Sequence, residues 1–95
     1  MKFSVVVPVY NEEDNVSLLV DELAAVIAGR TDAEVILVDD GSRDHTWKRI
    51  EQAAATHPFV HGVRSIRNRG QSAAMLLGLA HARGDVVVTM DGDLQ

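Results

Sequence analysis

Residues 3–40, FSVVVPVYNEEDNVSLLVDELAAVIAGRTDAEVILVDD, contain one complete strand–helix–strand unit. The run 3–10 is apolar and rich in β-branched residues, which predicts a buried strand with Pro8 near its end. Apolar residues recur at helical spacing over 11–29, and the run 34–40 predicts a second buried strand. The expected buried face of the helix consists of Val16, Leu19, Val20, Leu23 and Ile27. Two strands joined by a helix predict a right-handed crossover and hence parallel strands of one sheet.

The same alternation continues to the end of the chain. Helices are expected within 41–57 and 72–82, and strands at 59–66 and 85–91. The pattern predicts an α/β fold, a Rossmann-like parallel sheet of about four strands with helices on both faces. A length of 95 residues allows one domain at most.

Cap and turn residues predict where the helices begin and end. Asn11 is expected to cap the first helix, with the acidic residues 12–14 in its first turn and Gly29 closing it. Ser42 or Asp44 is expected to cap the second helix.

Composition excludes several classes of function. A net charge of −5 argues against general nucleic-acid binding. The absence of cysteine excludes disulfides and thiolate metal sites, so a metal would need oxygen or imidazole ligands. Neither a secretory signal nor a membrane-spanning run is visible, which favours a cytoplasmic location.

Polar residues follow each expected strand, in PVYNEE (8–13), DDGS (39–42), RNRGQ (67–71) and DGDLQ (91–95). Open parallel sheets bind ligands at the carboxyl ends of their strands, so we expect these segments to form one site. Acidic groups around a basic loop are stabilised when a divalent cation and a phosphate lie among them.

Asp91 and Asp93 are two positions apart, so their side chains point the same way if the strand continues. Gly92 between them allows a ligand to approach the backbone. Two carboxylates are hard ligands that suit Mg²⁺ or Mn²⁺. A β-turn with Asp-Gly at its centre is the alternative.

The other strand ends offer groups for a nucleotide. Asp40 is expected to accept a hydrogen bond from an N–H of a base, and Tyr10 presents a ring for stacking. Arg67 and Arg69 lie between a strand end and a helix N-terminus, where a phosphate is favoured. The alternatives are a capped turn at Asp40 and a solvated surface at the arginines.

Four stretches in order resemble the start of a family 2 glycosyltransferase with the GT-A fold. They are VVVPVYNEE (5–13), VILVDDGSRDHT (35–46), NRGQSAAMLLGLAHARGD (68–85) and VVVTMDGDLQ (86–95). The last two are most similar to the branch that transfers a sugar from a nucleotide to a polyprenyl phosphate, which includes dolichyl-phosphate mannose synthases and undecaprenyl-phosphate glycosyltransferases.

On the donor side, the resemblance implies that Pro8, Tyr10 and Glu12 lie near the base and ribose of a UDP- or GDP-sugar and that Asp40 binds the base. Arg67 or Arg69 would approach its phosphates.

On the metal side, the resemblance makes Asp91 and Asp93 the catalytic D-x-D pair, which holds Mg²⁺ or Mn²⁺ against the donor diphosphate, with Gly92 between them. Gln95 would extend the motif and contact the metal.

The resemblance also suggests that residues 1–95 are the nucleotide-sugar-binding part of a larger GT-A domain, cut after the D-x-D motif. We expect little or no transferase activity from them alone. In the full-length protein we expect a lipid-phosphate acceptor at the cytoplasmic face of the membrane. The fourth strand is expected to form an exposed edge, through which the chain could form homo-oligomers.

Two other classes compete with this interpretation. A response-regulator receiver domain also alternates strands and helices, but its acidic pair follows the first strand and it needs a late lysine, whereas no lysine follows Lys48 here. The second alternative is a non-catalytic α/β binding module. The presence of Asp40, Asp91 and Asp93 argues against it.

Overall fold

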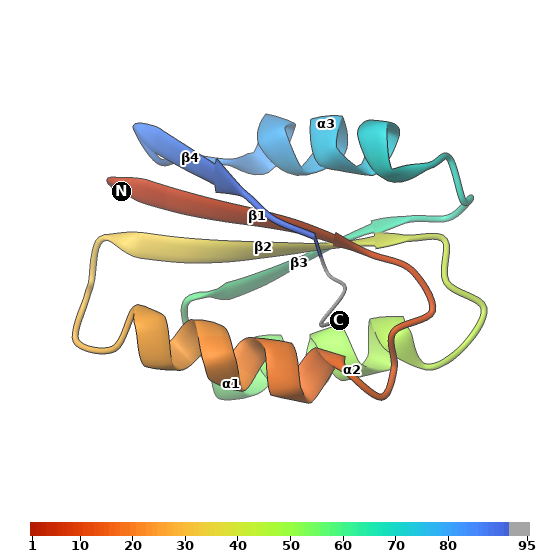
Figure 1. The fold of residues 1–95 in the computed structure, drawn as a ribbon, viewed down its shortest axis with the longest axis horizontal. Coiled ribbons are helices and arrows are strands. Elements are labelled where there is room, and N and C mark those ends of the chain that lie inside the picture. Colours follow the sequence, from red (N-terminus) through yellow and green to blue (C-terminus); the bar gives the residue numbers. More distant parts are fainter. Residues whose placement is uncertain (92–95) are drawn as a thin grey trace.

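The computed structural model describes residues 1–91 and consists of alternating strands and helices (Figure 1). The elements in chain order are β1 (Phe3–Val9), α1 (Val16–Val26), β2 (Ala33–Asp40), α2 (Thr46–Thr56), β3 (Val60–Ser65), α3 (Gln71–His81) and β4 (Val86–Thr89). The four strands form one parallel sheet in the order β3-β2-β1-β4. The predicted α/β fold with a parallel sheet is confirmed.

Helices cover both faces of the sheet, with α1 and α2 on one side and α3 on the other (Figure 1). Alternate residues of each strand point to opposite faces, so the sheet has two cores. Val7 and Leu37 pack with α1 and α2, whereas Val6 and Val38 pack against α3. The face of α1 predicted from its spacing is confirmed, because all five of its residues are buried in the first core.

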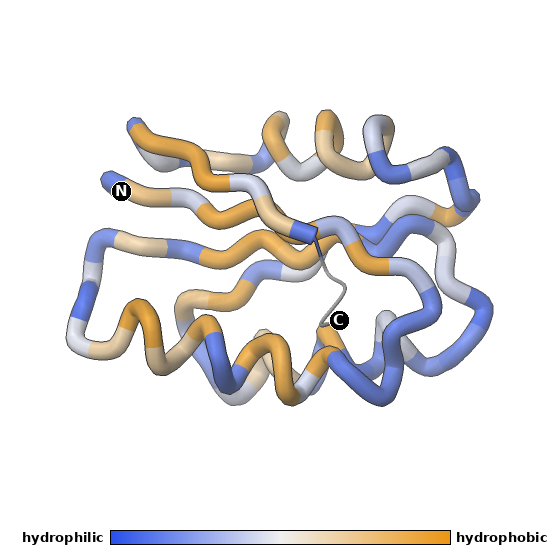
Figure 2. The backbone as a smooth tube through the Cα atoms, viewed as in Figure 1, coloured by the Kyte–Doolittle hydropathy of each residue, from blue (hydrophilic) through white to orange (hydrophobic). Residues whose placement is uncertain are grey.

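The register places the ends of β1 and β2 side by side, since Val9 pairs with Asp39. The loops that follow β1, β2 and β3 therefore lie together at the carboxyl edge, where the chain is hydrophilic (Figure 2). This edge is where the sequence predicts a site.

The expected start of the first helix is wrong. Helix α1 begins at Val16, and Asn11 lies in the preceding loop with a φ of 51°, so it caps no helix. The reason is competition for hydrogen bonds. The side-chain oxygen of Asn11, which a cap would use, instead accepts the backbone N–H of Arg43 at 2.9 Å. The backbone N–H groups of Asn11 and Glu12 donate to the hydroxyls of Ser42, in the loop after β2, and of Thr46, the first residue of α2.

Strand β4 is exposed on both faces, although its β-branched sequence is typical of a buried strand. It pairs with β1, and no helix of residues 1–91 covers it. Val86, Val87 and Val88 retain 46%, 38% and 46% of their accessible surface. The predicted exposed edge is confirmed, and pairing of that edge with a second chain stays a prediction.

A buried carboxylate at the opposite end of the sheet anchors the turn between α3 and β4. Glu34 is 1% exposed and accepts hydrogen bonds from the Ser4 hydroxyl, at 2.6 Å, and from the backbone and guanidinium of Arg83. Burial raises the pKa of the Glu34 carboxyl, but these hydrogen bonds outweigh burial and hold the pKa below its ordinary value of 4.5. The Glu34 cluster therefore stabilises the fold only while the carboxyl is ionised.

We predict a loss of stability in acid that depends on Glu34. A pKa lowered by folding contributes stability above the unfolded-state pKa, and this stability is lost as the pH falls through the folded-state pKa. The melting temperature should therefore fall as the pH drops below 4.5. Glu34→Gln should melt lower at pH 7 and show a smaller fall in acid, as measured by circular dichroism from pH 7 to pH 3. Glu22→Gln, on an exposed part of α1, is the control. An acid transition of equal size in Glu34→Gln and the unmodified chain would contradict the assignment.

Candidate functional site

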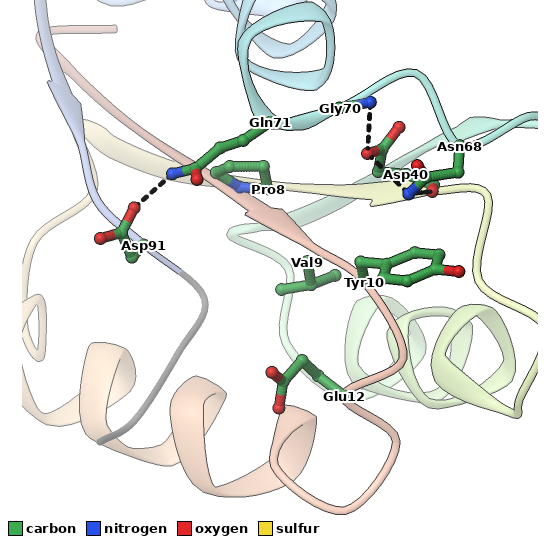
Figure 3. A pocket seen from close by; sticks show the side chains of 9 residues that line it. All are labelled: Pro8, Val9, Tyr10, Glu12, Asp40, Asn68, Gly70, Gln71 and Asp91. Carbon is green, nitrogen blue, oxygen red and sulfur yellow. Dashed lines mark hydrogen bonds between the residues drawn. The ribbon is translucent and has the colours of Figure 1, made fainter.

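The carboxyl edge of the sheet contains an open pocket of about 340 Å³ (Figure 3). Its walls come from the ends of β1, β2 and β4, the loop after β1 and the segment that leads into α3. The lining residues are Pro8, Val9, Tyr10, Glu12, Asp40, Asn68, Gly70, Gln71 and Asp91. All four strand ends or their loops thus contribute to one concave surface, as the topology predicts.

Asp40, at the end of β2, determines the path of the segment 68–70. Its Oδ1 accepts the backbone N–H of Arg69 at 2.9 Å, and its Oδ2 accepts the N–H of Gly70 at 3.0 Å. The amide of Asn68 donates to the same Oδ2 at 3.1 Å and to the Asp40 carbonyl. Asp40 is 4% exposed, and a carboxylate that deep needs such donors.

Asp39 points to the other face of the sheet and is fully buried. Its Oδ1 accepts the backbone N–H of Ser42 at 3.0 Å, whereas its Oδ2 has no hydrogen-bond partner within residues 1–91. The two aspartates therefore have different roles, since Asp39 accepts a local N–H and Asp40 lines the pocket. Both are buried, however, because each has backbone donors on its own face.

The loops after β1 and β2 are joined by hydrogen bonds that position Glu12. The N–H of Glu12 donates to the Thr46 hydroxyl at 2.8 Å, and that hydroxyl donates to Asp44 at 2.5 Å. The prediction that Ser42 or Asp44 caps α2 is wrong, because the N-cap position is His45. Asp44 nevertheless accepts the backbone N–H of Thr46, the first residue of the helix, at 2.9 Å. Burial raises the pKa of Asp44, but its hydrogen bonds to Thr46 and Glu13 outweigh burial and lower it.

Gly41 allows the loop after β2 to pass against the loop after β3. Its φ of 70° lies in the left-handed region, and a Cβ there would lie 2.3 Å from the backbone nitrogen of Asn68. Glycine avoids both the backbone strain and the steric clash, so Gly41 in the sequence DDGS permits this close approach of the two loops.

Asp91 lies just beyond β4 and faces the pocket (Figure 3). The side-chain amide of Gln71 donates a hydrogen bond to its Oδ1. Gln71 is the first residue of α3, so this bond connects the helix directly to the end of β4.

The structure brings together five of the predicted site residues, because Pro8, Tyr10, Glu12, Asp40 and Asp91 all line the pocket. Arg67 and Arg69 are exposed and do not line it, so the predicted contact of their side chains with a ligand has no support from the pocket. Gly92, Asp93 and Gln95 lie outside the described residues.

Sequence reasoning missed Asn68 and Gln71, although both belong to the segment RNRGQ that attracted attention for its arginines. The available signal was the position of Gln71 at the expected start of a helix that follows a strand end. Among residues 1–91, no three His, Asp or Glu side chains converge as a metal site.

The family model and the curated relatives that match this sequence all describe sugar transferases. The model of the family described as Glycosyl transferase family 2 matches residues 4–95. An undecaprenyl-phosphate 4-deoxy-4-formamido-L-arabinose transferase from Pseudomonas fluorescens is 48% identical over 95 residues, which cover 97% of this chain and 28% of that protein. A dolichol-phosphate mannosyltransferase from Pyrococcus furiosus is 38% identical, over 100% of this chain and 26% of that protein.

A solved structure shows the same fold. A mannosyltransferase from Pyrobaculum calidifontis, in complex with GDP-Man and Mn²⁺, superposes with a TM-score of 0.89 at 33% identity. The match covers 97% of this chain and 27% of that one. This chain therefore spans about a quarter of the length of the proteins it matches.

We predict that Gly41→Ala destabilises the chain more than Gly29→Ala does. Both glycines have a positive φ, but a Cβ at Gly29 would have nothing within 4 Å. Gly29→Ala should cost about 1–2 kcal/mol of backbone strain. Gly41→Ala should cost about 1–3 kcal/mol more, because the new methyl group collides with the backbone of the next loop. Urea unfolding of both variants measures the difference, and equal losses would show that the loops do not touch.

We also predict that Asp40→Asn loosens the segment 68–70. An asparagine keeps one acceptor oxygen, and its amino group faces backbone donors, so the free energy of unfolding should fall by about 1–3 kcal/mol. Amide hydrogen exchange should accelerate at Arg69 and Gly70. Asp21→Asn, exposed on α1, removes the same charge and is the control. Unchanged exchange at both amides in Asp40→Asn would contradict this role.

Proposed function

This chain belongs to glycosyl transferase family 2, and on that premise we propose that it forms the nucleotide-sugar-binding part of an enzyme that transfers a sugar from a nucleoside diphosphate to a polyprenyl phosphate. The observation that carries the proposal is the single pocket in which Tyr10, Asp40 and Asp91 meet. Tyr10 offers a ring and Asp40 an acceptor for the base, and Asp91 offers a carboxylate for the cation of the diphosphate.

The end of the pocket near β1 and β2 suits the base. Tyr10 is 42% exposed, so its ring is accessible for stacking. Oδ1 of Asp40 accepts one N–H in the structure, and a carboxylate oxygen can accept two. Asp40 thus keeps an acceptor position for an N–H of uracil or guanine while it holds the loop. Glu12, already positioned by Thr46, and Pro8 would lie near the ribose.

The end of the pocket near β4 suits a diphosphate and its cation. Asp91 supplies a hard oxygen ligand there, and one of its two oxygens is held by Gln71, so the donor chemistry fits Mg²⁺ or Mn²⁺. We propose that Asp91, Asp93 and Gln95 hold the ion, which when bound would stabilise the charge on the leaving nucleoside diphosphate. The contribution of the protein is to keep the Asp91 carboxylate at the mouth of the pocket.

The proposed acceptor class rests on the two relatives, whose names specify transfer to undecaprenyl phosphate and to dolichol phosphate. A phosphate acceptor is already an anionic nucleophile at neutral pH, so it needs no strong general base. We place the reaction of the full-length protein at the cytoplasmic face of a membrane, where such lipids are accessible. No helix in residues 1–91 has the length and apolar character required to cross a bilayer.

The receiver-domain alternative is wrong, since the glycosyltransferase family match extends over residues 4–95. A non-catalytic binding module of the same fold is the other alternative, and metal dependence of nucleotide binding distinguishes the proposal from it. The residues of the pocket are compatible with either uracil or guanine, so the binding experiment uses both UDP and GDP.

We predict that the chain binds UDP or GDP in calorimetric titration and that Mn²⁺ strengthens this binding. Asp93→Ala and Asp91→Ala should each weaken Mn²⁺-dependent binding by about tenfold or more, because each removes a proposed metal ligand. Asp85→Asn, at the other end of β4, is the matched acidic control and should bind as the unmodified chain does.

Two outcomes would contradict the proposal. A folded chain that binds neither nucleotide would refute nucleotide binding by these residues. A nucleotide affinity that is the same with and without Mn²⁺ and is unchanged by both substitutions would refute the metal-dependent mechanism.

A further inference from the structure

We propose that Gln71 is a positioning residue that orients the Asp91 carboxylate for the metal-bound diphosphate. The inference rests on the proposed function and deepens it, by assigning a role to a side chain outside the acidic motif. It is carried by one contact, in which the Gln71 side-chain amide donates to Oδ1 of Asp91 across the pocket (Figure 3).

Gln71 is itself held in place from two sides. The preceding residue, Gly70, donates its N–H to Asp40 at 3.0 Å, which connects the start of α3 to the end of β2. Behind it, α3 packs closely on the sheet, because a Cβ at Gly78 would lie 2.4 Å from a methyl group of Val6. The first residue of α3 therefore has a defined position relative to β1 and β2.

Asp91 lacks comparable support. Strand β4 pairs with β1 through four residue pairs, from Phe3–Val86 to Val6–Thr89, and no helix of the described part of the chain covers it. Asp91 lies two residues beyond the last pair, and Gln71 is its one side-chain hydrogen-bond partner within residues 1–91. The contact thus transfers the rigidity of α3 to a carboxylate at the end of an exposed strand.

The chemistry of an amide suits this task. A neutral N–H donor fixes the orientation of one carboxylate oxygen and leaves the charge of the group available for a cation. A lysine at position 71 would compete with the cation for that charge, and a glutamate would repel Asp91. The bond to Gln71 uses one lone pair of Oδ1, so the Asp91 carboxylate would retain the other acceptor sites for a cation.

The test is a double-mutant cycle between Gln71 and Asp91, read out by calorimetric affinity for UDP and GDP with and without Mn²⁺. Gln71→Met keeps the length of the side chain and removes the donor. It should weaken Mn²⁺-dependent binding by about tenfold, the usual cost of losing a partner of a metal ligand, and should leave metal-free binding unchanged. In the Asp91→Ala chain the same substitution should have no further effect, because the contact is already absent.

Gln52→Met, on the exposed surface of α2, is the matched control and should not change either affinity. An equal loss with and without Mn²⁺ in Gln71→Met, or an equal loss in the Asp91→Ala background, would overturn the inference, since Gln71 would then act on the nucleotide or on the fold. Unchanged Mn²⁺-dependent binding in Gln71→Met would overturn it as well. If the unmodified chain binds neither nucleotide, the proposed function fails and the inference fails with it.

Discussion

The arrangement of the site depends on one buried carboxylate. Asp40 lies at the end of β2 with almost no exposure, and it accepts hydrogen bonds from Asn68, Arg69 and Gly70. An isolated charge at that depth would be costly, so the loop after β3 must fold toward it. That loop leads directly into α3, so the carboxylate of Asp40 helps to determine where this helix begins, at Gln71.

Alternation along β2 extends this control to both sides of the sheet. Asp39 and Asp40 are neighbours in sequence, so their side chains point to opposite faces. Asp40 organises the loop on the α3 side, while Asp39 binds the backbone of Ser42 on the side of α1 and α2. The Ser42 hydroxyl accepts the N–H of Asn11, which brings in the loop after β1. Two adjacent acidic residues thus connect three loops, and the pocket lies where these loops meet.

Strand β4 illustrates that a strand-forming sequence does not by itself determine burial. The residues Val86, Val87 and Val88 have the β-branched character of a strand covered on both faces. Their residue types predict that they form a strand. Burial of that strand also requires another helix or strand to pack on its faces, and none does so within residues 1–91. Within residues 1–91, β4 has one neighbouring strand, β1.

The sequence by itself determined the order of the elements, the parallel sheet and the gathering of Tyr10, Asp40 and Asp91 at one edge. Hydrophobic period distinguishes strands from helices, and parallel topology then brings every strand end to the same side. The start of α1 was mispredicted, because Asn11 hydrogen-bonds to the loop after β2 and the N–H of Glu12 donates to Thr46, the first residue of α2.

Only the tertiary structure decided which side chains of the segment 67–71 enter the pocket. Arg67 and Arg69 carry charge and suggest phosphate binding, yet the pocket is lined by Asn68, Gly70 and Gln71. The physical reason is that Asp40 captures this backbone and sets which side chains turn inward. Which side chains face the pocket depends on the distances between strand ends, and a local sequence pattern does not determine these distances.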